Sequence, residues 1–321
     1  MVPVMPNVRR RTLLGAAAAA TLAACDSGPD YPPGPLRIAS GGVGGVYYTY
    51  AEGMAAVYRD ALPGLRPTVL TTPASVENLR LVAAGTAEIG FTTADAASDA
   101  YTGAAPFSAP LPVQALGRIY ENYLHLVVRV DRGINDVAEL RGRRVSVGAP
   151  ASGTELFATR LLPLAGLNIA RDVRAERLAP DIAADAVATG RLDAMFFSGG
   201  IPTGAIASLT RHTAIALVEL GSYVPRLRSL YGEVYVERTI PVSAYGLAVP
   251  TPTVGVANYL VVSRAMDAQV GYAVVRALFE HRDQLAAMHP AGSRLDRGSA
   301  VNTLPLPLHP GAVRYYREAK V

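Results

Sequence analysis

Short apolar runs alternate along this chain with longer stretches in which apolar residues recur at helical spacing. Strands are expected at residues 36–39, 67–70, 88–92, 124–130, 144–147, 175–178, 194–197, 214–220 and 254–262. Helices are expected at residues 46–62, 75–84, 95–101, 154–164, 182–188, 267–288 and 310–320, with a helical turn at 137–140. Strands that alternate with helices are typical of α/β proteins with parallel sheets. We therefore expect an α/β fold.

Two parts of the chain repeat the same order of elements. Residues 37–62 and 144–164 each predict a strand, a loop of small polar residues and a helix. Residues 85–88 and 190–193 each place a helix-ending glycine three positions before an acidic residue that precedes a strand. This is an echo in structure and not a repeat of fixed period. It predicts two similar halves.

Small polar turns follow several of the predicted strands. The carboxyl ends of strands are where open parallel sheets bind ligands, and a helix N-terminus there offers free N–H groups to an anion. The loop at residues 41–45 could equally be a flexible turn, and Ser75 could serve only as a helix cap. The candidate ligand-binding residues are Ser40, Gly41, Gly44, Tyr47, Ser75, Asn78, Thr93, Ser152, Gly153, Thr154, Gly200 and Pro202.

The sequence contains no recognisable motif for nucleotide binding, metal binding or catalysis. The glycine loop has no lysine for a phosphate-binding loop, and Tyr47 stands where a dinucleotide fingerprint needs glycine. Five scattered histidines show no ligand spacing, and His125 sits in an apolar strand. We therefore expect no enzyme activity, no metal and no cofactor. Arg80, Arg118 and Arg129 are the nearest cations for a ligand carboxylate, although each could lie on a solvated face.

The N-terminus has the pattern of an export signal. Arg9, Arg10 and Arg11 precede a short apolar run that ends in Leu-Ala-Ala-Cys at Cys25. The run is shorter than the roughly 20 residues that span a bilayer. The arginines fit either a general or a twin-arginine signal. We expect residues 1–24 to be a signal peptide and residues 25–35, rich in proline, to be a tether.

The net charge of +4 does not indicate nucleic-acid binding. Three of the positive charges belong to the predicted signal peptide, and the remaining chain is nearly neutral with no Lys/Arg run. Binding of nucleic acid needs clustered cations. Half of the residues are apolar and 17% are charged, which excludes a disordered chain.

Several short motifs follow one another along the folded part of the chain. The glycine loop continues as Val46-Tyr47-Tyr48, and further motifs lie at residues 75–81, 124–129, 140–148, 152–154, 193–197, 200–202 and 307–316. In this order, together with residues 41–48, they resemble the TAXI family of TRAP-transporter solute receptors. Thr72-Pro73-Ala74 departs from the family, which usually has Gly-Gly or similar before Ser75, and residues 92–95 replace its Gln-Ser-Asp.

Cys25 ends a stretch that is similar to the lipobox of bacterial lipoproteins.

The resemblance implies a two-lobed periplasmic-binding-protein fold of type II, in which each lobe is a mostly parallel sheet flanked by helices and two strands cross between the lobes. Lobe I would be residues 36–124 plus 255–321, and lobe II residues 125–254. A small anionic or zwitterionic solute, such as glutamate, glutamine or a related dicarboxylate, would bind between them. The protein would be a monomer that delivers this solute to TRAP membrane subunits. Lipid on Cys25 would anchor it to the outer face of the cytoplasmic membrane. An anchored sensor for a signalling partner is the alternative.

Overall fold

The computed structural model describes residues 1–3 and 30–320. The predicted signal peptide beyond residue 3, Cys25 and most of the predicted tether lie outside the described residues. In the part of the chain described, no helix is both long and apolar enough to cross a membrane.

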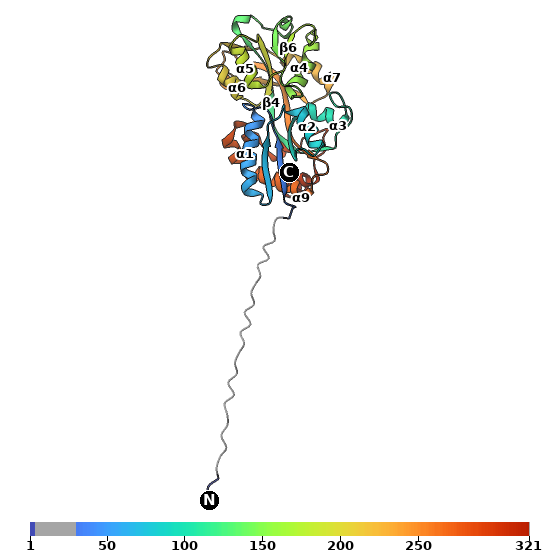
Figure 1. The fold of residues 1–321 in the computed structure, drawn as a ribbon, viewed down its shortest axis with the longest axis vertical. Coiled ribbons are helices and arrows are strands. Elements are labelled where there is room, and N and C mark those ends of the chain that lie inside the picture. The colour runs from blue at the N-terminus through green and yellow to red at the C-terminus, as the bar shows by residue number, and fades with distance from the viewer. Residues whose placement is uncertain (4–29, 321) are drawn as a thin grey trace.

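The chain forms an α/β structure of two halves stacked end to end (Figure 1). The lower half contains β1–β3, α1–α3 and α9–α12; the upper half contains β5–β9 and α4–α8; β4 and β10 run through both. The strands are β1 (Gly34–Ala39), β2 (Leu65–Leu70), β3 (Ile89–Thr93), β4 (Val113–Arg129), β5 (Arg144–Ser146), β6 (Arg174–Glu176), β7 (Ala194–Gly199), β8 (Ile215–Leu217), β9 (Tyr235–Ile240) and β10 (Thr251–Ser263).

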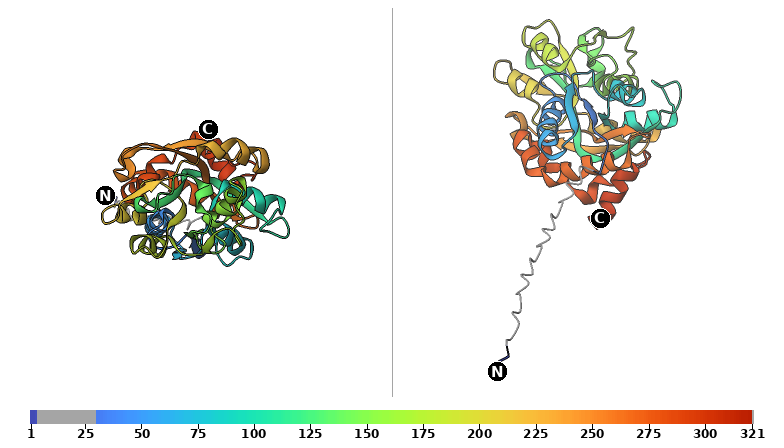
Figure 2. Two further views of the ribbon diagram at one scale, coloured as in Figure 1. Left: turned by 90° about the horizontal axis from the view of Figure 1, so that it is seen from above. Right: turned by 60° about the horizontal axis from the view of Figure 1, so that its bottom comes forward.

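Helices flank the strands on both sides. They are α1 (Val46–Ala61), α2 (Ser75–Ala83), α3 (Ala94–Thr102), α4 (Gly153–Leu164), α5 (Pro180–Ala188), α6 (Gly204–Leu209), α7 (Val224–Tyr231), α8 (Val242–Tyr245), α9 (Ala268–Glu280), α10 (Arg282–Met288), α11 (Arg297–Ala300) and α12 (Pro310–Glu318), with short 3-10 helices η1 (Val130–Arg132), η2 (Val137–Leu140), η3 (Gly221–Tyr223) and η4 (Pro290–Arg294). In the view from above, the C-terminal segments lie on the opposite side from the N-terminal ones (Figure 2).

The strands form one mixed sheet in the order β2-β1-β3-β10-β4-β7-β5-β6. Its outer parts are parallel, because β1 pairs with β2 and β3, and β5 pairs with β6 and β7. Its centre is antiparallel, since β4 and β10 pair with each other and with β7 and β3. The expected α/β class is confirmed, and the sheet is more mixed than the sequence predicts.

The two central strands change partners half-way along their length. Residues 258–262 of β10 pair with β3, whereas residues 251–256 pair with β9. In β4, residues 123–128 pair with β7, and the earlier residues pair with β10. Each strand therefore belongs to the lower half at one end and to the upper half at the other. The lobe boundaries at 124/125 and 254/255 stay a prediction.

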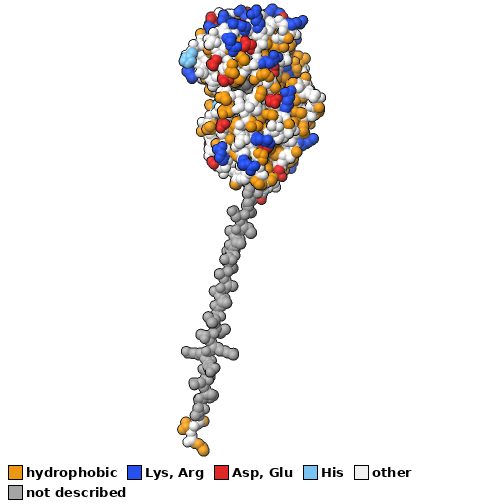
Figure 3. All heavy atoms as spheres, in the orientation of Figure 1, with side chains coloured by type: hydrophobic (Ala, Val, Ile, Leu, Met, Phe, Trp, Pro, Cys, Tyr) orange, Lys and Arg blue, Asp and Glu red, His pale blue; other side chains and the backbone are white. Residues whose placement is uncertain are grey.

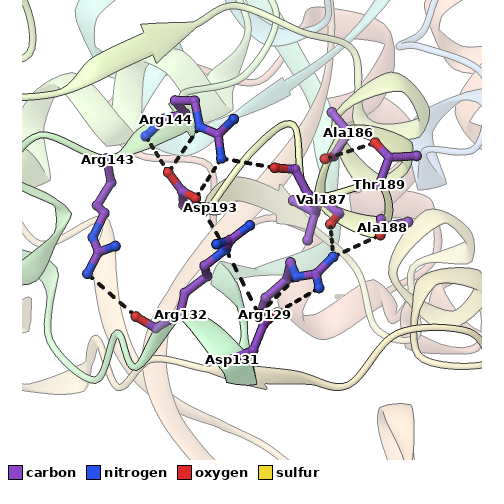
Figure 4. Close-up of polar contacts among 11 residues, drawn as sticks. Arg129, Asp131, Arg132, Arg143, Arg144, Ala186, Val187, Ala188, Thr189 and Asp193 are labelled. Carbon is purple, nitrogen blue, oxygen red and sulfur yellow. Dashed lines mark hydrogen bonds and ion pairs between the residues drawn. The ribbon is translucent and has the colours of Figure 1, made fainter.

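Each half contains the same internal brace. In the lower half, Arg37 donates from its side chain to Glu88 and to the carbonyl of Gly85, and its backbone N–H also bonds Glu88. In the upper half, Arg144 makes the corresponding three bonds to Asp193 and Gly190 (Figure 4). These bonds join the first strand of each half, β1 or β5, to the turn before its third strand, β3 or β7. The predicted echo between the halves is confirmed at the level of atoms.

Several segments differ from the sequence prediction. Helices α6 and α7 were not expected, and Gly34 and Pro35 of the predicted tether belong to strand β1. Strand β4 begins at Val113, eleven positions before the expected start, because Gly117 and the polar residues around Asn122 mask its β pattern. Gly117 is required there since a Cβ would collide with the Tyr316 hydroxyl. The expected helix 267–288 is two helices, because His281 leaves helical geometry with φ −106° and ψ 23°. Strand β9 alternates buried and exposed positions and was not expected.

Candidate ligand-binding site

A cavity lies between the two halves, where the N-terminal ends of α1, α2, α4 and α5 face one another. The space between its walls measures about 610 Å³, including the part open to solvent. The lower half contributes the wall around Tyr47 and Ser75, and the upper half the wall around Thr154 and Phe197. The lining residues are Gly41, Gly42, Gly45, Val46, Tyr47, Pro73, Ala74, Ser75, Tyr120, Asn122, Gly148, Ala149, Ser152, Gly153, Thr154, Leu178, Pro180, Ala183, Phe196, Phe197, Ser198 and Gly199.

A series of hydrogen bonds runs along the cavity wall from the lower half to the upper half. The Tyr47 hydroxyl donates to Asn258, whose amide donates to Asn122 Oδ1 over 2.7 Å. Asn122 donates in turn to the Ser198 hydroxyl, and the Ser198 N–H donates to Thr154 Oγ1. These groups come from α1, β10, β4, β7 and α4. These bonds fix the orientation of the polar side chains along the cavity wall, since buried polar groups are stable only when paired.

The helices α2 and α4 begin at the same point of the cavity. A Cβ added to Gly153 would lie 2.8 Å from Ser75 Oγ and 3.2 Å from Thr93 Oγ1, so the two N-termini are in direct contact. In the described part of the chain, the backbone N–H groups of Ser75, Gly153 and Thr154 donate to no acceptor. Each helix start carries partial positive charge. Two such ends facing each other form a place for an anion.

A buried hydroxyl adjoins the same point. Thr93 is 2% exposed, and its Oγ1 has no hydrogen-bond partner among the described residues. Thr93 also precedes the first residue of α3 and makes no side-chain cap bond to that helix. A buried hydroxyl without a hydrogen-bond partner lowers the stability of the folded protein. Thr93 therefore adds a free polar group to the two helix starts.

The halves touch on both sides of the cavity. On one side, the Glu77 N–H donates to the carbonyl of Ala151 over 3.1 Å. On the other, a Cβ on Gly42 would lie 3.4 Å from Pro180 Cδ, which is ordinary contact distance. Because these contacts join α2 to the α4 turn and the glycine loop to α5, the structure shows the two halves closed on the cavity.

Backbone strain concentrates at the same contacts. Ala74 has φ 94° and Ala151 has φ 59°, values that residues with a Cβ seldom adopt. Ala74 is the position directly before α2. Strained backbone of this kind is retained mainly at functional sites.

The arginines that the sequence offered as partners for a ligand carboxylate lie elsewhere. Arg80 bonds the carbonyl of Pro106, and Arg118 pairs with Glu121. Arg129 pairs with Asp131 and donates to the last carbonyls of α5 (Figure 4). None of the three lines the cavity.

His125 is buried beside Phe197 and bonded to the Tyr245 hydroxyl. Burial lowers its pKa to about 4, so the imidazole is neutral at pH 7. In the described residues, no group of three or more His, Cys, Asp or Glu side chains is placed to hold a metal ion.

Six of the twelve candidate residues line the cavity together: Gly41, Tyr47, Ser75, Ser152, Gly153 and Thr154. Ser40 is buried behind the wall and donates to the carbonyl of Leu70. Gly44 faces Asp181, and Gly200 packs against the Tyr120 ring. Pro202, after a cis peptide bond, lies beyond the lining.

Asn78 is placed differently from the sequence expectation. It is fully buried, and its amide donates to the carbonyls of Ser40 (2.6 Å) and Phe91 (2.8 Å). Its Oδ1 accepts from the Thr72 hydroxyl. All of these bonds stay within the lower half, so Asn78 holds the glycine loop, α2 and β3 together and does not reach the cavity.

The sequence reasoning also did not single out several polar residues in or next to the cavity wall, among them Tyr120, Asn122, Ser198 and Asn258. Asn258 is a polar residue inside an otherwise apolar strand, and this is the signal that could have identified it. Asn122 is 2% exposed and Asn258 is fully buried. A buried amide in a strand needs a polar partner, so it indicates a site or a polar network.

Solved structures with a similar fold are known. A protein from Bordetella bronchiseptica RB50 matches with a TM-score of 0.51 and 18% identity, over 86% of this chain and 83% of that one. The periplasmic aliphatic sulphonate binding protein SsuA from Escherichia coli matches with a TM-score of 0.49 and 16% identity, over 89% and 83%. The MOPS-bound alkanesulfonate-binding protein SsuA from Xanthomonas axonopodis pv. citri matches with a TM-score of 0.47 and 19% identity, over 89% and 84%.

One family model matches nearly the whole folded part. It is that of the NMT1-like family, and it covers residues 38–319, including every residue of the cavity. The narrower assignment to the TAXI family stays a prediction. A match over this span shows that the chain belongs to the NMT1-like family.

Proposed function

We propose that this protein is an extracytoplasmic solute-binding receptor that closes two lobes around a small acidic solute. Lobe I is residues 36–124 plus 255–321, and lobe II is residues 125–254. The observation that carries the proposal is the cavity at which the free N-termini of α2 and α4 meet. A cavity built from two halves of one chain suits a protein that captures and releases a small molecule.

The cavity holds an anion through neutral donors. Ser75, Gly153 and Thr154 offer backbone N–H groups, and the hydroxyls of Ser75 and Thr93 lie at the same place. Hydrogen bonds to a charged group contribute roughly 1.5–3 kcal/mol each. Several such bonds in a cavity shielded from water give tight binding without an arginine.

Calorimetry with small mono- and dicarboxylates tests this function. The purified protein lacking residues 1–29 should bind at least one of these acids with a 1:1 stoichiometry and melt at a higher temperature when it is bound. Ser75→Ala, which removes one of the hydroxyls at the helix starts, should weaken binding about 10- to 150-fold, the factor for one charge-assisted hydrogen bond. The function is wrong if no small acid at 10 mM changes either measurement.

The bound solute is delivered to TRAP membrane subunits, and lipid on Cys25 keeps the receptor at the outer face of the cytoplasmic membrane. The motifs at residues 41–48 and 307–316 and the Leu-Ala-Ala-Cys stretch support this part of the proposal. Proteoliposomes that contain the TRAP subunits should take up the acid when the receptor and an ion gradient are both present. Uptake that requires ATP would contradict it. A Cys25→Ala variant should lose labelling by a fatty-acid analogue.

A further inference from the structure

We infer that the solute has no cationic group, so that it is an organic acid and not an amino acid. This inference rests on the proposed function and narrows it. The 22 lining residues of the cavity, all within residues 30–320, include no Asp, Glu, Lys, Arg or His. A zwitterion needs a partner for its ammonium group as well as for its acid. The cavity supplies only the second.

The acidic side chains near the cavity lie outside its lining. Glu155 accepts from the backbone N–H of Ala151 and from Arg177. Asp95 accepts from the Tyr235 hydroxyl and the backbone N–H of Ala96. Asp181 is exposed beside Gly44 and outside the lining. Glu155 and Asp95 are therefore bonded within the protein, and Asp181 lies outside the lining.

The neutral groups of the wall do not replace a carboxylate. The Tyr47 hydroxyl already donates to Asn258, and burial raises its pKa well above the usual range, so it carries no charge at pH 7. The helix starts at Ser75 and Gly153 present partial positive charge, which repels a cation. An ammonium group would therefore lose its water, meet two like charges and gain no anionic partner.

The remainder of the wall suits the apolar part of an organic acid. Val46, Leu178, Ala183, Phe196 and Phe197 present hydrocarbon surface, and the Tyr120 ring adds an aromatic face. The Tyr120 hydroxyl is buried without a partner among the described residues, and it offers one further neutral hydrogen bond. The solute class is therefore a carboxylate or sulfonate on a short uncharged body.

Matched pairs of compounds that differ only by an amino group test the inference. The pairs are glutarate and glutamate, 3-phenylpropanoate and phenylalanine, and ethanesulfonate and taurine. In every pair that binds, calorimetry at pH 7 should give the acid without the amine at least about 10-fold the affinity of its partner. Equal or tighter binding of the amino compound would overturn the inference and leave the proposed function intact. Binding of neither member in any pair would overturn both.

A charge placed in the wall should reverse this preference. Leu178 is half-buried and lines the upper wall. Leu178→Glu should weaken binding of the preferred acid and move the ratio within its pair towards the amino compound by about 10-fold or more. Leu178→Gln, which has the same shape and no charge, should keep the original ratio. The same ratio in both variants would contradict the inference, because a carboxylate in the cavity must then be irrelevant to an ammonium group.

Discussion

The two halves meet at two neighbouring places that share α4 and handle charge differently. At the cavity the lining contains no charged side chain. At what we call the α3–α4 network, Arg160 of α4 donates to Asp99 of α3 over 2.6 Å and to the Tyr235 hydroxyl over 3.0 Å, and Tyr235 donates to Asp95. Arg160, Asp95 and Asp99 are each less than 9% exposed. The network therefore buries charges of both signs, and the cavity buries none.

This difference shows which buried polar groups have a partner within the chain and which do not. In the α3–α4 network, every charged group faces an opposite charge from the same chain. At the start of α4, the first-turn carboxylate Glu155 is bonded to the Ala151 N–H and to Arg177. The backbone N–H groups of Gly153 and Thr154 donate to no acceptor among the described residues. On the surface, arginine side chains gather over the far end of the upper half (Figure 3). We infer that the negatively charged solute is the acceptor for these N–H groups of α4.

The largest effect is expected from removing the cation of the network. Arg160→Met leaves two buried carboxylates without their partner and should lower the free energy of unfolding by about 3–5 kcal/mol. Urea denaturation at pH 7 measures it. Arg191→Met is the control, because Arg191 pairs with Glu176 at the surface with 48% of its side chain exposed, and it should change little. Equal losses in both variants would mean that burial of the network is not what matters.

A smaller loss of stability is expected at Asn78. Asn78→Ala leaves the buried carbonyls of Ser40 and Phe91 without a donor, and it should cost about 2–4 kcal/mol. Ser152→Ala removes only the side-chain bond that caps α4 and should cost about 1 kcal/mol. The melting temperatures of the ligand-free proteins distinguish them. An unchanged melting temperature in Asn78→Ala would contradict this structural role of Asn78.

Closure can be blocked at Gly153 without weakening either half. An added methyl group would meet Ser75 Oγ from the other half at 2.8 Å, so Gly153→Ala should lower solute affinity by about 10-fold or more. The ligand-free melting temperature should stay the same or rise, since alanine is the better helix former. Gly34→Ala, with nothing within 4 Å of the new Cβ, is the matched control. Native affinity in Gly153→Ala would show that the halves do not close at this point.

The smallest effect concerns pH. Burial raises the pKa of Asp99 from its ordinary 3.8 to about 6. Between these values the folded state binds a proton that the unfolded chain has released, so the stability gained from this group is complete below about pH 4 and is lost as the pH rises through 6. Asp99→Asn should flatten the stability curve over this interval. Asp172→Asn should change the slope in the opposite sense, because bonds to Asn168 and Arg141 lower the pKa of Asp172.

The sequence predicts the local parts of this structure well. Turns of small polar residues after strands identified Ser75, Ser152 and Thr154, because capping preference and helix starts are local properties. The echoed order of elements at residues 37–62 and 144–164 also predicted two similar halves, although not the arginine bonds that each half contains.

Contacts between distant segments could not be predicted in this way. Asn258 bonds Asn122 from 136 positions away, and its register depends on two β-bulges between β10 and β4. Asn78 looked like a ligand contact because it follows a helix start, but β3 passes close enough to take its amide. The Arg160 network likewise joins three elements whose proximity no single stretch of sequence shows.

A crystal structure of the protein with its tightest-binding organic acid tests the central claim most directly. The anionic group should lie between α2 and α4, within hydrogen-bond distance of the backbone N–H groups of Ser75, Gly153 and Thr154, with the uncharged body against Tyr120 and Phe197. An anion paired instead with an arginine, or a solute bound outside the space between the two halves, would contradict the claim that the helix starts hold it.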